Sequence, residues 1–96
     1  MNNYEIMFIV KSTIEKEEVA KVADYLKKVI TDNKGEIESF KELGQKELAY
    51  PIKKEISGYY FLVNLSASAE AIKEFDRKAL IEENLIRHLI INLDKE

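Results

Sequence analysis

Hydrophobic positions follow two different periods in the first third of the chain. Residues 4–10 are apolar at almost every position, which is typical of a strand covered on both faces. Between residues 15 and 33 the period becomes helical, and one apolar stripe is formed by Val19, Val22, Ala23, Leu26, Val29 and Ile30. Glu15 is the expected N-cap of this helix, and Gly35 is the expected C′ residue that ends it.

The next segment predicts one long, bent strand. Residues 36–40 alternate between polar and apolar side chains, and residues 48–52 form a second apolar stretch. Gly44 interrupts the pattern, so we expect a β-bulge there. Pro51 has no backbone N–H to donate, which predicts that this strand lies at a sheet edge.

A second strand completes a predicted hairpin. Residues 53–57 are polar and are expected to form its loop, with a turn at Gly58. Residues 59–65 are rich in aromatic and branched side chains and are expected to form the returning strand.

The last third predicts a helix and a final strand. Ser66 or Ser68 can cap the helix, whose buried side is formed by Ile72, Phe75 and Ala79. Residues 85–93 form the last strand. The order strand, helix, strand, strand, helix, strand is the split βαβ pattern of ferredoxin-like α+β folds. We therefore expect one domain over residues 1–96, with a four-stranded antiparallel sheet and both helices on one face.

Two helices cover only one face of such a sheet, yet the central strands are apolar on both. If Ile6 and Phe8 face the helices, an apolar patch remains on the open face. Its predicted members are Met7, Ile9, Tyr60, Leu62 and, from the last strand, Leu89. Such patches usually mark an interaction surface, and a protein partner or a second copy is preferred to covering loops. Base stacking is less favoured because Tyr60 would be the only aromatic ring there.

Composition restricts the function. Charged residues make up 34% of the chain, but their sum is -3, which argues against a nucleic-acid binder held by bulk positive charge. The absence of cysteine excludes disulfides and thiolate chemistry. The single histidine, His88, has no evident nucleophile beside it, and three scattered glycines form no phosphate loop. We expect a cytoplasmic protein that is not an enzyme and needs no metal or cofactor.

The middle of the chain carries a specific resemblance. Residues 44–54, Gly-Gln-Lys-Glu-Leu-Ala-Tyr-Pro-Ile-Lys-Lys, followed by Gly-Tyr-Tyr at 58–60, resemble the signature of the sixth protein of the bacterial small ribosomal subunit. The Tyr-Glu pair at 4–5 and the run Glu-Asn-Leu-Ile-Arg-His at 83–88 are similar to the same family. The resemblance covers essentially the whole chain, in order and with matching spacing.

The resemblance implies a non-catalytic adaptor of the small subunit. Family members bind the central domain of the small-subunit ribosomal RNA as a heterodimer with the eighteenth small-subunit protein, which is strongly basic. Such a partner would explain how an acidic protein holds RNA. The RNA contacts implied by the matched motifs are Lys46, Lys53, Lys54 and Arg87, with Tyr50 and Tyr59 beside them. Asn2 and Asn3 stand where family members often have basic residues.

One alternative shares the same order of elements. A small-molecule-binding regulatory module of ACT type would respond to amino acids and would have no affinity for RNA. Weak self-association of the free protein also stays open.

Overall fold

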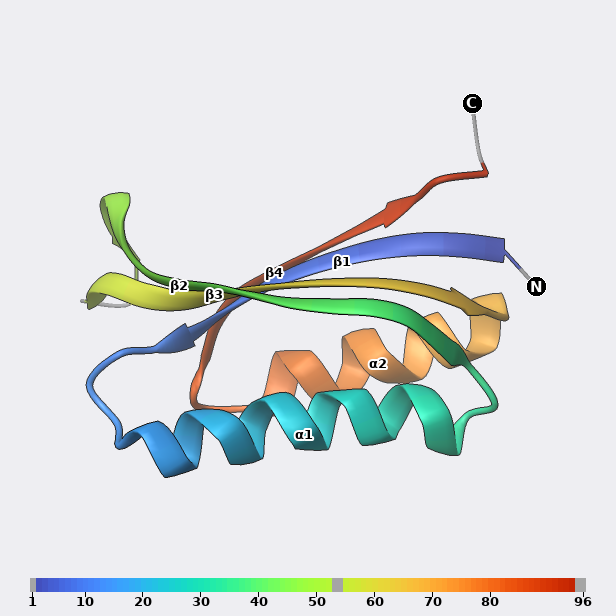
Figure 1. Cartoon of the computed structure of the whole chain (residues 1–96), viewed down its shortest axis with the longest axis horizontal. Helices are drawn as coiled ribbons and strands as arrows, with labels where there is room; N and C mark the ends of the chain where they lie inside the picture. The colour runs from blue at the N-terminus through green and yellow to red at the C-terminus, as the bar shows by residue number, and fades with distance from the viewer. Residues whose placement is uncertain (1, 53–54, 95–96) are drawn as a thin grey trace.

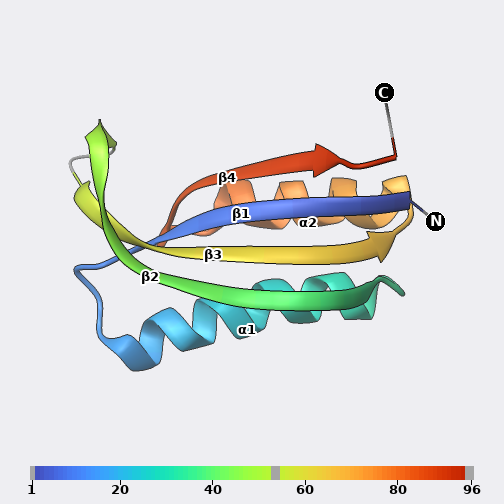
Figure 2. The ribbon, with the colours of Figure 1, turned by 45° about the horizontal axis from the view of Figure 1, so that its top comes forward.

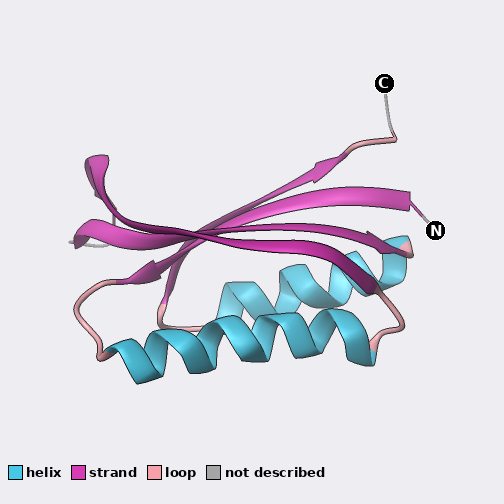
Figure 3. Ribbon diagram, in the orientation of Figure 1, coloured by secondary structure: helices cyan, strands magenta, loops and turns pink. Residues whose placement is uncertain are grey.

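The computed structural model describes residues 2–52 and 55–94, and these form strands and helices in the expected order (Figure 1). The elements are β1 (Asn2–Lys11), α1 (Lys16–Asp32), β2 (Glu36–Ile52), β3 (Glu55–Ala67), α2 (Ala69–Ile81) and β4 (Leu85–Asn92). Figure 3 shows the strands as one layer with both helices against the same face. The ferredoxin-like α+β fold is therefore confirmed.

The strands lie side by side in the order β2-β3-β1-β4, and every neighbouring pair is antiparallel (Figure 2). β1 and β3 are central, as their apolar sequences predict. β2 lies at an edge, as predicted from Pro51, which cannot donate a ladder hydrogen bond. Gly44 has a φ of 86° and the β2–β3 register shifts beside it, so the predicted bulge is confirmed.

The core lies between the sheet and the helices. Alternate residues of β1 point into it, and Ile6, Phe8 and Val10 are fully buried. The rings of Phe8 and Phe61 stack with their centroids 5.0 Å apart. Each helix buries one apolar stripe against this layer, as the helical period predicts. Within the described segments, neither helix is long and apolar enough to cross a membrane.

The start of α2 agrees with the sequence prediction, but the end of α1 does not. Ser68 caps α2, and its hydroxyl accepts a hydrogen bond from the Ala71 N–H at 3.2 Å. At the end of α1, however, the left-handed residue is Lys34, with a φ of 66°. The Lys34 N–H donates to the Thr31 carbonyl and the Gly35 N–H to the Ile30 carbonyl, which defines a Schellman motif.

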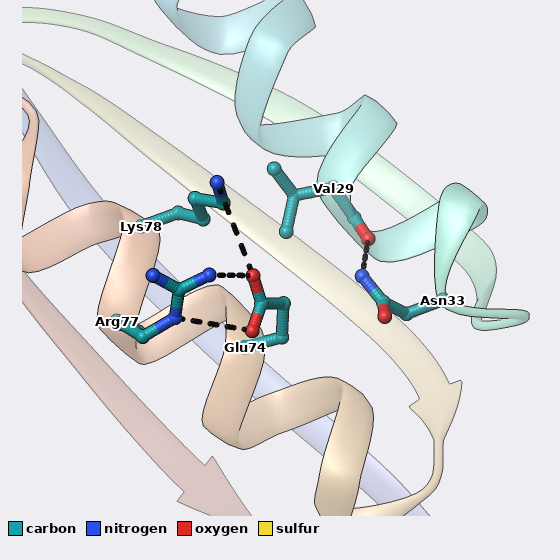
Figure 4. Close-up of polar contacts among 5 residues, drawn as sticks. All are labelled: Val29, Asn33, Glu74, Arg77 and Lys78. Atoms are coloured by element: carbon teal, nitrogen blue, oxygen red, sulfur yellow. Dashed lines mark hydrogen bonds and ion pairs between the residues drawn. The ribbon is translucent and has the colours of Figure 1, made fainter.

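Gly35 is therefore the C″ residue, one position beyond the observed C′ residue Lys34, and the prediction of Gly35 at C′ is wrong. A Cβ at Gly35 would lie 2.7 Å from Cγ2 of Ile30, so this glycine provides space rather than an unusual φ. The same end of α1 is closed by Asn33, whose Nδ2 donates to the Val29 carbonyl at 2.7 Å (Figure 4).

The prediction of a loop at 53–57 with a turn at Gly58 is wrong. β3 begins at Glu55, and β2 pairs with it as far as Ile52 opposite Glu55, so only residues 53 and 54 separate the strands. Gly58 lies inside β3 with Lys11 on one side and Lys46 on the other. A Cβ at Gly58 would collide with Cγ2 of Ile9. Close packing, rather than a turn, explains this glycine.

Candidate partner and nucleic-acid interface

The open face of the sheet is built from alternate residues of all the described strands. Because neighbouring strands are paired antiparallel, residues on this face line up in rows across the strands, with register shifts at the bulges. The central row contains Leu89, Met7, Leu62 and Lys41. The row toward the hairpin contains Arg87, Ile9, Tyr60 and Gly44. The row toward the chain termini contains Ile91, Glu5, Asn64 and Ser39.

The apolar surface of this face is most exposed along β4. Leu89 is 44% exposed and Ile91 43%, whereas Met7 and Leu62 are half-buried. Leu93, the residue after the end of β4, is 53% exposed. The sequence prediction included only Leu89 from this strand. The two-residue period of a strand was the signal that places Ile91 on the same face as Leu89. The patch therefore extends to the β4 edge of the sheet.

Ile9 belongs to the open face but is covered by its neighbours. It is only 3% exposed and lies outside the main core cluster, together with the buried Ile86. A Cβ at Gly58 would approach both side chains, so the glycine marks where they meet. Ile9 thus supports the open face and leaves Tyr60 and Leu89 nearer to its surface.

Charges on the open face separate along the strand direction. Toward the hairpin lie the basic residues Lys11, Lys46 and Arg87, while Lys41 lies at the β2 edge of the central row. Toward the termini lie acidic and amide groups. There the Ser66 hydroxyl is 2.9 Å from a Glu38 carboxylate oxygen and 2.7 Å from Oδ1 of Asn3. The Asn3 N–H donates to Asp94 at 2.7 Å. One end of the face is therefore basic and the other acidic.

Two of the predicted RNA contacts lie at the basic end of the open face. Lys46 and Arg87 belong to the opposite edges of the open face, with Tyr60 and Ile9 between them. Nζ of Lys46 lies 5.8 Å from the centroid of the Tyr60 ring, within range of a cation–π contact. In Figure 1, β2 bends away from the helices at this end, so the hairpin rises on the open side.

One other predicted RNA contact, Tyr59, lies away from this position. Tyr59 is on the helix side, where it packs against the core and lines a hollow of about 270 Å³ with Val19 and Glu42. Tyr50 lies in β2, near the hairpin tip. Lys53 and Lys54 lie outside the described residues.

The only histidine of the chain has a structural partner. His88 is on the helix side of β4, and its Nε2 lies 2.7 Å from Oδ1 of Asp76 in α2. The rings of Phe75 and His88 are arranged edge to face, with their centroids 6.3 Å apart. His88 therefore links β4 to α2 instead of serving the open face.

These features define a small ferredoxin-like protein whose sheet has one open face, apolar in the middle and oppositely charged at its ends. Residues 3–92 match the family model of ribosomal protein S6. A small ribosomal subunit protein bS6 from Alkaliphilus oremlandii is 44% identical over 95 residues, which are 99% of this chain and all of that protein. The chain belongs to the ribosomal protein S6 family.

A solved structure agrees with this assignment. The crystal structure of the 30S ribosomal protein S6 from Thermotoga maritima has a TM-score of 0.91 at 26% identity, and covers 95% of this chain and 86% of that one. As a member of the family, the chain is a structural, non-enzymatic and cytoplasmic ribosomal protein of the small subunit. The resemblance seen in its motifs is thereby confirmed.

Proposed function

We propose that this protein binds the central domain of the small-subunit ribosomal RNA together with the eighteenth small-subunit protein, as an adaptor that performs no chemistry. The observation that carries the proposal is the division of the open face into an apolar middle, a basic end and an acidic end. One surface of this kind offers separate places for a protein and for RNA.

The apolar middle and the acidic end suit a basic protein partner. Exposed side chains of β4 supply area that would leave water on docking, which is the main favourable term in protein association. Glu5 lies in the row next to the apolar middle, and Glu38 lies beside Ser66 toward the chain termini. Both carboxylates can attract a cationic partner. The central residues of this docking surface are Met7, Tyr60, Leu62 and Leu89, with Ile9 beneath them.

The basic end suits RNA phosphates. Lys46 and Arg87 carry positive charge toward the hairpin, which also contains Tyr50, Lys53 and Lys54. The net charge of -3 makes tight binding by the chain alone unfavourable. A basic partner on the same face would add the missing charge.

The direct test is a titration of an RNA fragment of the central domain. The chain alone, the partner alone and an equimolar mixture are compared at several salt concentrations. We expect tight binding only from the mixture, with a steep dependence on salt because phosphate contacts release counterions. Equally tight binding by the chain alone, or no binding by the mixture, would refute the proposal.

The docking surface is tested by one charge substitution with a matched control. Leu89→Asp places a charge in the apolar middle, whereas Leu80→Asp places it on an exposed leucine of α2, outside the open face. We expect the first change to abolish binding of the partner in calorimetry and the second to leave it unchanged. Equal affinities for both variants would place the partner elsewhere.

A further inference from the structure

A lysine that belongs to none of the matched motifs lies at the basic end of the open face. Lys11 is the last residue of β1, and it shares a cross-strand row with Lys46, with Gly58 between them. Adjacent strands are about 4.8 Å apart, so the Cα atoms of the two lysines are roughly 10 Å apart. Both lysines rise from the same face of the sheet.

Arg87 closes the group on the other edge. It pairs with Ile9, two residues before Lys11 in β1, and it occupies the open face of β4. Diagonal neighbours of this kind have Cα atoms roughly 7–8 Å apart. A phosphate has room between three such side chains, because lysine and arginine stems are long and flexible.

Hydrogen bonds to neighbouring segments fix the backbone at Lys11 and Lys46. The Lys11 N–H donates to the Asn84 carbonyl at 2.9 Å. One residue further on, the Ser12 hydroxyl lies 2.8 Å from the Ser57 hydroxyl, which joins the end of β1 to β3. Gly58 has no side chain, so the row between Lys11 and Lys46 holds no competing polar group. The spacing of the charges is therefore set by the sheet.

The electrostatic surroundings differ from those of the helical lysines. Lys21, Lys27 and Lys78 each lie within 4.0 Å of a carboxylate on their own helix. Within the described segments, neither Lys11 nor Lys46 forms an ion pair. The carboxylate of β1 on this face, Glu5, is six residues from Lys11, which is roughly 20 Å along a strand.

We propose that Lys11, Lys46 and Arg87 together form a phosphate-binding site for the RNA backbone at this end of the open face. The inference rests on the proposed function and makes it more specific, because Lys11 and the shared row are new to the site. The three cations bind the backbone by charge and position the RNA, without reading its sequence.

The test uses the complex of the chain with its basic partner and the same RNA fragment. Lys11→Gln is compared with Lys28→Gln, which removes an exposed lysine of α1 on the far side of the molecule. We expect Lys11→Gln to weaken RNA binding severalfold and to reduce the slope of log affinity against log salt by roughly one. The double variant Lys11→Gln with Lys46→Gln should reduce this slope by roughly two. Lys11→Arg keeps the charge and should retain the full slope.

The outcomes separate the two proposals. Wild-type binding of RNA with an unchanged slope for Lys11→Gln overturns the site and leaves the proposed function intact. If Lys28→Gln reduces the slope as much as Lys11→Gln does, the proposed site is also overturned, because the effect would then reflect the total charge of the protein. If the wild-type complex does not bind the RNA, both proposals fail. Unchanged partner affinity and melting temperature show that Lys11→Gln is folded.

Discussion

The two faces of the sheet use the same strands but are built for different neighbours. In β1, Phe8 is fully buried against the helices, while the adjacent Met7 on the open face is only half-buried. In β4 the contrast is similar, since Ile90 packs against the core and Ile91 is 43% exposed. In the middle of the sheet, apolar side chains occur on both faces. The two faces differ because the helices of this chain cover one of them and leave the other open (Figure 3).

The comparison teaches that apolar character and burial are separate properties here. On the helix side, apolar residues stabilise the fold directly, because the chain removes them from water. On the open side, much of the same gain is available only when another molecule docks. Substitutions at equivalent places on the two faces should therefore affect different measurements.

The largest contrast is expected between Phe8→Ala and Met7→Ala. Phe8→Ala leaves a cavity among stacked rings and should lower the free energy of unfolding by about 3–5 kcal/mol. Met7→Ala removes a half-buried side chain and should cost about 1 kcal/mol in the free protein. Urea denaturation followed by circular dichroism measures both values. Equal losses would mean that the open face is part of the folding core.

A smaller contrast is expected between two glycines. Gly58→Ala forces a Cβ against Ile9, beneath the open face, and should lower the free energy of unfolding by about 1–3 kcal/mol. At Gly44 an added Cβ would meet no atom within 4 Å, and asparagine tolerates a positive φ. Gly44→Asn should therefore cost less than about 1 kcal/mol. If Gly58→Ala proves the milder change, Ile9 has more freedom than its burial indicates.

The smallest effect is expected on the outer surface of α2, which belongs to neither face of the sheet. The hydrogen bond from Arg77 lowers the pKa of Glu74, against a weaker opposing effect of desolvation (Figure 4). A carboxylate with a lowered pKa stabilises the fold above its unfolded pKa, and this contribution is lost as pH falls through the folded value.

Glu74→Gln should therefore reduce the melting temperature slightly at pH 7. The difference from wild type should shrink as the pH falls below the ordinary carboxyl value of 4.5. Thermal melts at several pH values measure it. A difference that is independent of pH would show that Glu74 acts through packing instead of charge.

Much of the fold follows from local patterns in the chain. The change from a period of two to a period of 3.6 separates the strands from the helices. Pro51 predicts the sheet edge and Gly44 the bulge, because each residue has a backbone property that does not depend on distant neighbours. The errors concern Gly35 and Gly58, where space in three dimensions decides the residue. Pattern alone assigned Gly35 to the C′ position of the helix and Gly58 to a turn.

The candidate site was predicted less completely for the same reason. Alternation assigns each residue to one of two faces within its own strand, but it does not align one strand with the next. Tyr59 follows Gly58 and belongs to the matched motif, yet it lies on the helix side, away from Lys46. Lys11 carried no motif, yet the register places it in the same row as Lys46.

The sequence by itself determined the order of elements, the edge position of β2 and the family. It also showed that the central strands carry apolar residues on both faces, more than a sheet covered on one face needs. Tertiary structure decided which of those residues stay exposed and how charges from distant segments gather. Helical and strand periods arise from backbone geometry within a few residues. The rows of the open face, in contrast, join β1 to β3 and β4 across most of the chain, and only the hydrogen-bonded register brings them together.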